Sequence, residues 1–305
     1  MGNNATRVWL NKRLDGKTAL ITGSNTGIGK ATAKELYRSG ARVIMACRDV
    51  EKAKTALSEI QKEVGNQENV GELVIKQLNL GSFSSIRQCA DEINRQEEKV
   101  HFLINNAGIM MCPKGKTVDG YELHFGVNHL GHFLLTCLLL PKIISSAPAR
   151  IINVSSTIYK QGEIRWDDYN FDKGRYSAIG AYAQSKLANV LFTMELAKKL
   201  KDKGVVVYSL HPGVVKTELG RHMDETYFRG LRWVSSVLFG PFFRTPDEGA
   251  MTTLYCVLKD DEDFSGCYFS DCKVNETNLE QQHGEAAKKL WNLSSKLVNY
   301  DVNLD

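Results

Sequence analysis

Short apolar runs alternate along the chain with longer segments in which apolar residues recur every three or four positions. The short runs predict strands at 18–22, 41–46, 73–78, 100–105, 150–155 and 205–210. The longer periodic segments predict helices at 30–39, 51–63, 82–96, 120–145 and 181–197. Strands that alternate with helices form parallel sheets whose connections cover both faces. We therefore expect a single α/β domain built on a doubly wound parallel sheet, because no repeat, low-complexity tract or linker interrupts the pattern.

The composition limits the classes of function. With 305 residues, 43% of them hydrophobic, the chain can bury a large core. Its net charge of +4, from 39 basic and 35 acidic residues without a basic stripe, argues against a nucleic-acid partner. Its seven scattered cysteines form no Cys-x-x-Cys pair, which predicts reduced thiols in a cytoplasmic protein. Because we find no signal peptide and no apolar stretch of about 18 residues, we expect no membrane-spanning helix.

A glycine-rich turn, from Gly23 to Gly29, joins the first predicted strand to its helix. Bare Cα positions let a backbone approach a pyrophosphate, and a helix N-terminus offers free N–H groups to it. The spacing is Gly-x-x-x-Gly-x-Gly, which differs from the better-known Gly-x-Gly-x-x-Gly dinucleotide motif. The turn predicts a dinucleotide phosphate site, with a purely structural tight turn as the alternative.

The end of the second predicted strand indicates which dinucleotide binds. An acidic residue there would hold the adenosine ribose of NAD. This chain has Cys47 at that position and Arg48 directly after it, and a guanidinium suits the 2′-phosphate of NADP. We therefore predict NADP(H). Asp49 leaves an alternative, because a small shift in register would make it the ribose ligand; we interpret it as the N-cap of the next helix.

Tyr182 and Lys186 lie four residues apart, so on a helix their side chains share one face. A free phenol has a pKa of about 10, and a nearby ammonium favours the phenolate and lowers that pKa. The pair is therefore a candidate acid/base group. The alternative is a surface tyrosine and lysine on an ordinary helix, and the motifs upstream decide between the two.

Five motifs follow one another in the order TGSNTGIG at 22–29, NNAG at 105–108, NVSS at 153–156, YAQSK at 182–186 and HPG at 211–213. Together they resemble the short-chain dehydrogenase/reductase family over residues 17–271. Three further segments look most like the NADP-preferring retinol dehydrogenases of that family: ACRD at 46–49, VNHLGHF at 127–133 and SKLANVLF at 185–192. The resemblance implies a Rossmann-type fold and an NADP(H)-dependent oxidoreductase.

The resemblance also implies a role for each matching position. Tyr182 matches the family's acid/base tyrosine, and Lys186 matches the lysine that lowers its pKa and binds the nicotinamide ribose. Ser156, the second of two serines, matches the serine that binds the substrate oxygen, and Asn128 matches the asparagine whose carbonyl orders a water. The implied cofactor-binding residues are Gly23, Ser24, Asn25, Thr26, Gly27, Ile28, Gly29, Arg48, Asn79, Leu80, Asn106, Ala107, Gly108, Tyr182, Lys186, Pro212, Gly213, Val215 and Thr217.

Three features depart from the family's pattern. Asn79 stands where the family usually has an aspartate that accepts a hydrogen bond from adenine, and its carbonyl oxygen can accept the same bond. The segment 157–180 is longer than in compact members and resembles that of the retinol-type enzymes. No segment matches the N-terminal transmembrane anchor that those enzymes generally carry, so we expect a cytoplasmic location.

The start of the chain also predicts peripheral contact with intracellular membranes. Residues 1–6 fit the N-myristoylation pattern, with Gly2 as the acceptor. A basic and aromatic flank follows and could supply the second signal that a single acyl chain needs. The alternative is an unmodified polar leader. We divide the chain into a leader at 1–16, a catalytic domain at 17–275, and a C-terminal helix and tail at 276–305.

Two helical features have competing interpretations. The apolar segment 133–140 is expected to be a core helix or, as the resemblance implies, to pair two subunits in a homodimer together with the helix of Tyr182. His124, His129 and His132 lie at helical spacings, but no carboxylate or cysteine completes a ligand set. We therefore expect no metal site.

Residues 217–246 are rich in aromatic and aliphatic side chains, and we interpret them as a substrate-binding lid. Such a segment could close over a lipophilic substrate or contact a membrane surface, whereas plain packing against the core is the alternative. The prediction is an oxidoreductase for a lipophilic alcohol/carbonyl pair, with all-trans-retinal or a similar isoprenoid or fatty aldehyde as the leading substrate. A broad carbonyl or steroid reductase is one alternative, and a non-catalytic nucleotide-sensing or scaffold protein is another.

Overall fold

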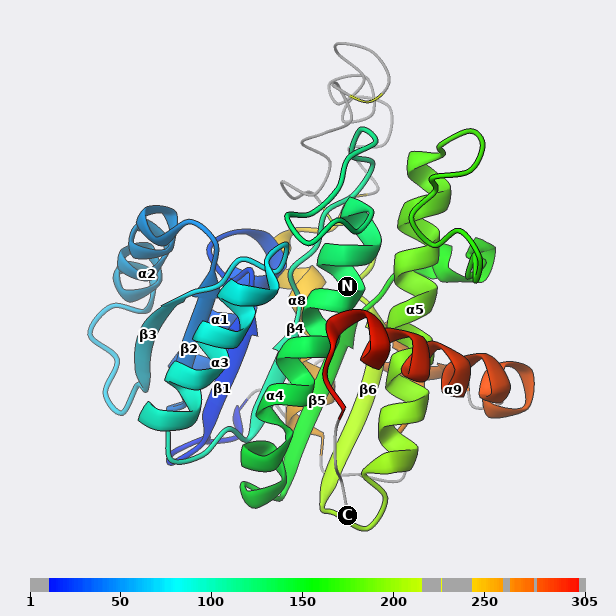
Figure 1. Ribbon diagram of the computed structural model, residues 1–305. Helices are drawn as coiled ribbons and strands as arrows, with labels where there is room; N and C mark the ends of the chain where they lie inside the picture. Colours follow the sequence, from blue (N-terminus) through cyan, green and yellow to red (C-terminus); the bar gives the residue numbers. More distant parts are fainter. Residues whose placement is uncertain (1–10, 216–225, 227–242, 260–263, 277–278, 302–305) are drawn as a thin grey trace.

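The structure, a computed structural model, describes residues 11–215, 226, 243–259, 264–276 and 279–301. Its centre is an eight-stranded sheet with the strand order β3-β2-β1-β4-β5-β6-β7-β8 (Figure 1). The strands are β1 Thr18–Thr22, β2 Arg42–Cys47, β3 Glu72–Gln77, β4 Phe102–Asn105, β5 Ala149–Val154, β6 Val205–His211, β7 Tyr268–Ser270 and β8 Lys273–Glu276. All neighbouring strands pair in parallel except β7 and β8, which are antiparallel.

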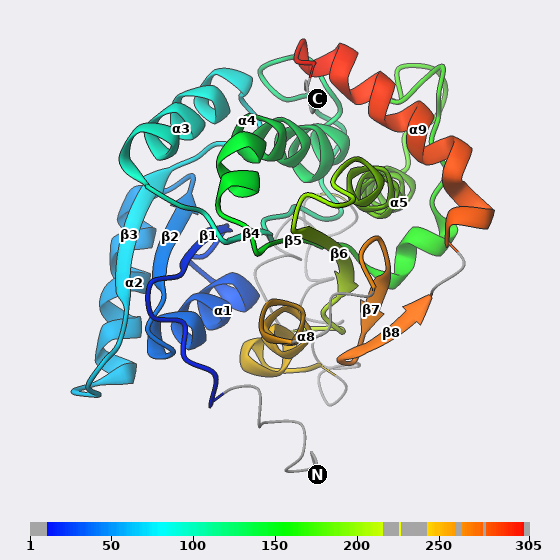
Figure 2. The same ribbon diagram turned by 90° about the horizontal axis from the view of Figure 1, so that it is seen from below.

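Helices cover both faces of this sheet (Figure 2). One face carries α1 Gly27–Arg38, α2 Val50–Val64 and α8 Pro246–Leu258. The other face carries α3 Phe83–Gln96, α4 Gly131–Ser145, α5 Ala178–Lys199 and α9 Leu279–Val298. Alternate residues of a strand point to opposite faces, so Leu20 packs into the cluster of α3 and α4 while Ile21 packs into that of α1. The doubly wound α/β fold is therefore confirmed.

The strand order reverses between β1 and β4, because the chain winds outward from β1 to β3 and then returns to β4 and continues to β6. Open α/β sheets bind ligands in the crevice at such a reversal, outside the carboxyl ends of the strands. The glycine turn that follows β1 and the NNAG motif that follows β4 both lie at this point.

Most predicted elements agree with the structure to within one or two residues, and five differences are larger. Helix α5 begins at Ala178, three residues before the predicted start at 181. Helix α1 begins at Gly27 rather than at residue 30, because the last glycines of the turn form the first helical turn. The predicted helix at 120–145 consists of a π-helix, η2 Phe125–Leu130, followed by α4. The segment 157–180 contains a 3₁₀ helix, η3 Thr157–Gln161. The sequence pattern also missed α8, β7 and β8; β7 has only three residues, too few for a periodic signal.

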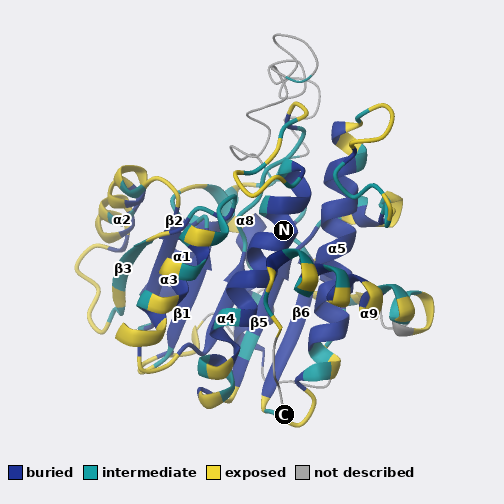
Figure 3. Cartoon of the chain, viewed as in Figure 1, coloured by how far each residue is buried: buried dark blue, intermediate teal, exposed yellow. Residues whose placement is uncertain are grey.

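The sequence analysis expected no membrane-spanning helix, yet one helix of the structure, Phe125–Ser145, is long and apolar enough for such a span. By length and composition, this 21-residue helix is the one candidate among the described residues. Polar residues such as Asn128 and Thr136 interrupt its apolar runs, so no continuous apolar stretch marks it in the sequence. However, 72% of its most apolar window is buried inside the protein (Figure 3). Burial of this extent is typical of a core helix, which is the position that this helix occupies in the fold.

The C-terminal helix α9 packs along α5 and reaches α4 (Figure 1). The ring of Trp291 lies 5.0 Å, centroid to centroid, from that of Phe133 on α4 and 6.0 Å from that of Phe192 on α5. Ser294 hydrogen-bonds His129 on η2 at 2.8 Å. Helix α9 therefore covers part of the face through which the homodimer is expected. The homodimer remains a prediction, and a dimer that pairs through α5 must accommodate α9.

We predict that Trp291→Ala lowers the free energy of unfolding by about 3–5 kcal/mol, because it removes a buried ring that joins α9 to α4 and α5. Urea unfolding monitored by circular dichroism measures the change. Lys288→Ala, at an exposed position on the same helix, is the matched control and should change the value by less than about 0.5 kcal/mol. Equal stabilities for the two variants would show that α9 does not pack as described.

Candidate active site

The turn after β1 has room only for glycine at its critical positions. Gly23 has a φ of +65°, in the left-handed region, and a Cβ there would lie 2.9 Å from the Cβ of Ala107. A Cβ on Gly29 would lie 2.5 Å from both the Asn106 side-chain nitrogen and the Gly23 carbonyl. Thr26, the N-cap of α1, makes no side-chain capping bond, so that the first N–H groups of the helix stay available to a ligand. This geometry fits a pyrophosphate group.

A cavity of about 1110 Å³ extends from this turn along the carboxyl ends of the central strands. It contains residues from each of the five motifs, and it brings together residues that lie far apart in the sequence. The predicted site residues that line it are Gly23, Asn25, Thr26, Gly27, Ile28, Gly29, Arg48, Asn79, Leu80, Asn106, Ala107, Gly108, Ser156, Tyr182, Lys186, Pro212, Gly213 and Val215.

Of the predicted site residues that the structure describes, two do not line the cavity. Ser24 is fully buried behind the turn, where its hydroxyl donates to the Ile21 carbonyl at 3.1 Å. Asn128 is fully buried beneath the catalytic end. Thr217 and most of the predicted lid at 217–246 lie outside the described residues, as does Gly2.

Tyr182 and Lys186 project from α5 at the catalytic end of the cavity, and each is at most 5% exposed. The Lys186 ammonium donates to the Val154 carbonyl at 3.1 Å and lies 5.6 Å from the centroid of the Tyr182 ring. Of the two adjacent serines, Ser155 donates its hydroxyl to the Lys186 carbonyl at 2.8 Å, whereas the Ser156 hydroxyl lies near enough to the Tyr182 phenol to lower its pKa. Ser156 is therefore the serine placed to share a substrate oxygen with Tyr182.

Burial controls the pKa values of this pair. It raises the pKa of Tyr182 to about 12, although the nearby Ser156 hydroxyl works in the opposite direction. It lowers the pKa of Lys186 to about 8. Lys186 adds nothing to the shift of the Tyr182 pKa, because its ammonium donates to the Val154 carbonyl; that Lys186 lowers the pKa of the phenol stays a prediction. At neutral pH Tyr182 is thus a neutral phenol that can donate a proton.

Asn128 fixes the backbone beneath the catalytic pair. Its side-chain amide donates to the Ile109 carbonyl and to the Ser185 hydroxyl, both at 3.0 Å, and its side-chain oxygen accepts from the Ile109 N–H at 2.9 Å. Its main-chain carbonyl, which the resemblance assigns to a bound water, accepts a bond at 2.9 Å from Nδ1 of His132. The carbonyl that the resemblance assigns to a water is thus also a hydrogen-bond partner of His132.

Sequence reasoning missed a link between this carbonyl and the glycine turn. The Thr22 hydroxyl accepts from the N–H groups of Asn106 at 3.0 Å and Ala107 at 2.9 Å, and it lies 2.9 Å from Nε2 of His132. Burial lowers the pKa of His132 to about 4, so the ring is neutral, donates through Nδ1 and accepts at Nε2. The sequence signal was the spacing of Asn128 and His132, one helical turn apart.

The sequence analysis considered His132 only as a metal ligand. Within the described ranges, no group of three or more His, Cys, Asp or Glu side chains could hold a metal ion. His132 instead serves the hydrogen-bond network that joins Thr22 to Asn128.

The other end of the cavity is basic and polar. Cys47 is buried, and Arg48 is exposed at the cavity edge, where it makes no hydrogen bond or ion pair with any residue that the structure describes. Asp49 accepts a bond at 3.0 Å from the Lys52 N–H, which confirms the N-cap interpretation. The side-chain oxygen of Asn79 accepts from the Gly81 N–H at 3.0 Å, so that only its second lone pair is left for adenine. The cavity thus fits a nicotinamide dinucleotide, with glycines at the phosphates and Arg48 at the adenosine end.

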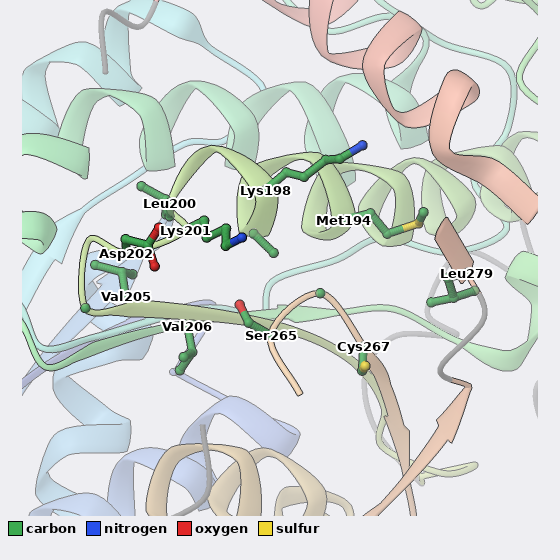
Figure 4. A pocket seen from close by; sticks show the side chains of 13 residues that line it. Met194, Lys198, Leu200, Lys201, Asp202, Val205, Val206, Ser265, Cys267 and Leu279 are labelled. Atoms are coloured by element: carbon green, nitrogen blue, oxygen red, sulfur yellow. The ribbon is translucent and has the colours of Figure 1, made fainter. Parts of the chain in front are cut away.

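A second cavity of about 570 Å³ lies at the opposite, amino end of β6 (Figure 4). Its lining comes from the end of α5, the start of β6 and the segment before β7, and includes Met194, Lys198, Lys201 and Asp202. None of the predicted site residues in the described part of the chain lines it. The candidate chemistry therefore belongs to the larger cavity.

Comparison with known proteins agrees with this geometry. The chain matches the short chain dehydrogenase family over residues 17–227. It is 49% identical over 289 residues to retinol dehydrogenase 12 of Mus musculus, covering 94% of this chain and 88% of that protein. It is 48% identical over 294 residues to retinol dehydrogenase 11 of Mus musculus, covering 96% and 90%.

A solved structure of an uncharacterized protein from Mycobacterium paratuberculosis has 33% identity and a TM-score of 0.75, covering 96% of this chain and 97% of that one. The solved Pseudomonas aeruginosa RhlG/NADP complex, at 24% identity and a TM-score of 0.65 over 84% of this chain and 95% of that one, shares the fold. The sequence match, the fold and the geometry of the cavity lead to one conclusion: the chain belongs to the short-chain dehydrogenase/reductase family, close to its retinol dehydrogenases, and is an oxidoreductase that uses a nicotinamide cofactor.

Proposed function

We propose that the protein transfers hydride between NADP(H) and a lipophilic alcohol/carbonyl pair, with all-trans-retinal as the leading substrate and a similar isoprenoid or fatty aldehyde next. The observation that carries the proposal is the neutral phenol of Tyr182, which lines a cavity together with Ser156 and Lys186, while the other end of that cavity carries Arg48. The names of the relatives, retinol dehydrogenases 11 and 12, support a retinoid substrate.

In this proposal the residues of the chain act on the substrate oxygen. NADPH, when bound, supplies the hydride. Negative charge then develops on the carbonyl oxygen, where a proton donor and a second hydrogen bond must converge. Tyr182 donates the proton, and Ser156 holds the oxygen by a hydrogen bond. The Lys186 ammonium, held by the Val154 carbonyl, keeps positive charge close to the phenol ring while the proton leaves.

The lining of the cavity supports a lipophilic substrate. Ile109 and Cys112 line it just after the NNAG motif, and apolar walls of this kind favour hydrocarbon chains over small polar ketones. A broad carbonyl or steroid reductase would use the same walls and remains the second candidate. The assembled acid/base group argues against a non-catalytic scaffold protein.

We also propose a cytoplasmic location with peripheral contact with intracellular membranes through an acylated Gly2. Mass spectrometry of the N-terminus of protein produced in a eukaryotic host tests this directly. A myristoyl group on Gly2 is the expected result, and a free or acetylated N-terminus contradicts it.

Tyr182→Phe should lower the rate of NADPH consumption with all-trans-retinal by about 10²- to 10⁴-fold, because it removes the proton donor and leaves the ring in place. Stopped-flow absorbance of NADPH measures the rate, and fluorescence titration of NADPH checks that cofactor affinity is unchanged. A wild-type protein that reduces other carbonyls but not retinal would support the broad reductase. A wild-type protein that reduces no carbonyl compound at all would contradict an enzymatic function.

The pH profile of kcat/KM for reduction should follow the ionisation of the Lys186 ammonium. Its lowered pKa of about 8 means that the ammonium is present below pH 8 and lost above it, whereas Tyr182, with a raised pKa of about 12, keeps its proton throughout. We therefore expect a flat profile from about pH 6 to 7.5 and a decline above about pH 8. Initial rates at subsaturating aldehyde measure it. A rate that rises above pH 8, or that stays level to pH 10, contradicts this assignment.

Arg48→Ala should raise the KM for NADPH by about 10- to 100-fold, because it removes charge-assisted hydrogen bonds to the 2′-phosphate. The KM for NADH, which lacks that phosphate, is the internal control and should stay the same within about twofold. An equal rise in the KM for NADPH and in the KM for NADH would show that Arg48 does not select NADP(H).

A further inference from the structure

A buried carboxylate, that of Glu122, lies close to the catalytic tyrosine and outside all five motifs. It is 1% exposed, and the neighbouring His124 is fully buried. One carboxylate oxygen lies 2.7 Å from Nδ1 of His124 and accepts from the Tyr176 hydroxyl at 3.2 Å. The other oxygen accepts from the Phe125 N–H at 2.8 Å. The Glu122 carboxylate thus has three hydrogen-bond partners within the protein: His124, Tyr176 and the Phe125 N–H.

The hydrogen bonds determine which nitrogen of His124 carries a proton. Nε2 accepts a bond at 3.2 Å from the N–H of Cys112, so the proton is on Nδ1 and faces Glu122. The Tyr176 hydroxyl lies 3.2 Å from the Cys112 carbonyl as well as from Glu122. The N–H of Cys112 is therefore held by His124, and its carbonyl shares the single proton of the Tyr176 hydroxyl with Glu122.

This cluster, Glu122–His124–Tyr176, contacts the catalytic end of the cavity from two sides. Cys112 lines the cavity itself. The His124 ring meets the Tyr182 ring edge to face, with centroids 6.1 Å apart. Tyr176 comes from the long segment 157–180, and Asn170 of the same segment accepts from the Glu122 N–H at 2.9 Å. The segment that lengthens this chain relative to compact relatives is thus tied to the wall beside Tyr182.

Helix capping alone does not explain the cluster. The bond from the Phe125 N–H to Glu122 is a capping bond and uses one carboxylate oxygen. A small polar side chain would make that bond without burying a charge. The second oxygen is used only to hold His124 and Tyr176, and through them Cys112.

We propose that Glu122, His124 and Tyr176 are positioning residues that set the substrate fit of this site, by holding Cys112 in the cavity wall and the His124 ring against the ring of Tyr182. The inference deepens the proposed function and rests on it, since it concerns the carbonyl substrate of the same cavity. The cluster is expected to affect the KM for the carbonyl compound and to leave the affinity for NADPH unchanged.

The test is Tyr176→Phe, which removes one hydroxyl and keeps the ring against Phe171. Tyr121→Phe is the matched control, because the Tyr121 hydroxyl donates at 2.8 Å to the backbone carbonyl of Leu297 on α9, outside the cavity. Two quantities are measured for both variants: the KM for all-trans-retinal at saturating NADPH, and the rate at which iodoacetamide alkylates Cys112, followed by peptide mass spectrometry. Cys112 is 2% exposed, so its alkylation in the wild type should be slow.

Tyr176→Phe should raise the KM about tenfold and speed the alkylation of Cys112 at least fivefold, with the dissociation constant of NADPH unchanged. Tyr121→Phe should leave both quantities within twofold of the wild type. Glu122→Gln should change both in the same direction as Tyr176→Phe. Equal KM values and equal alkylation rates for Tyr176→Phe and Tyr121→Phe would overturn the proposal. If the wild type reduces no carbonyl, the proposed function fails, and unchanged alkylation of Cys112 in Tyr176→Phe would still refute the positioning role.

Discussion

The removal of Tyr182 and Lys186 from water is the constraint on which the rest of the site depends. Burial disfavours the charged form of each group, so the phenol keeps its proton and the ammonium comes close to losing one at neutral pH. An exposed tyrosine at the same place would exchange hydrogen bonds with water and would not be directed at a substrate oxygen. The site is thus prepared to give a proton, which is the step that carbonyl reduction needs.

The surrounding fold supplies that burial. Helix α5 is buried along nearly its whole length, between the sheet on one side and α9 on the other (Figure 3). The end of β5 provides the Val154 carbonyl that holds the Lys186 ammonium, and Asn189 donates to the same carbonyl at 3.3 Å. Beneath the pair, the Thr22 hydroxyl and the neutral ring of His132 join the glycine turn to Asn128. A cofactor held by the turn is therefore connected to the acid/base group through fixed, fully hydrogen-bonded elements.

The sequence predicted those parts of the structure whose signal is local. The order of strands and helices follows from hydrophobic periodicity. The residues that line the cavity follow from short motifs, in which each glycine, serine or tyrosine has one expected role. The direction of the pKa shift at Tyr182 could not be predicted, because it depends on how deeply α5 is buried and on which acceptor the lysine finds. Trp291 and Glu122 likewise acquire their roles only from long-range packing, against α5 in one case and against Tyr176 in the other.

Titration of the Tyr182 phenol tests this account most directly. Protein labelled with ¹³C at the tyrosine ζ carbon, without cofactor, gives the ionisation of each tyrosine by NMR, and a Tyr182→Phe sample identifies the resonance. The account predicts that the Tyr182 signal keeps the chemical shift of a neutral phenol from pH 6 to beyond pH 10, because burial raises its pKa to about 12. An ionisation near pH 7 in the cofactor-free protein would contradict it, and would show that Lys186 rather than burial controls the phenol.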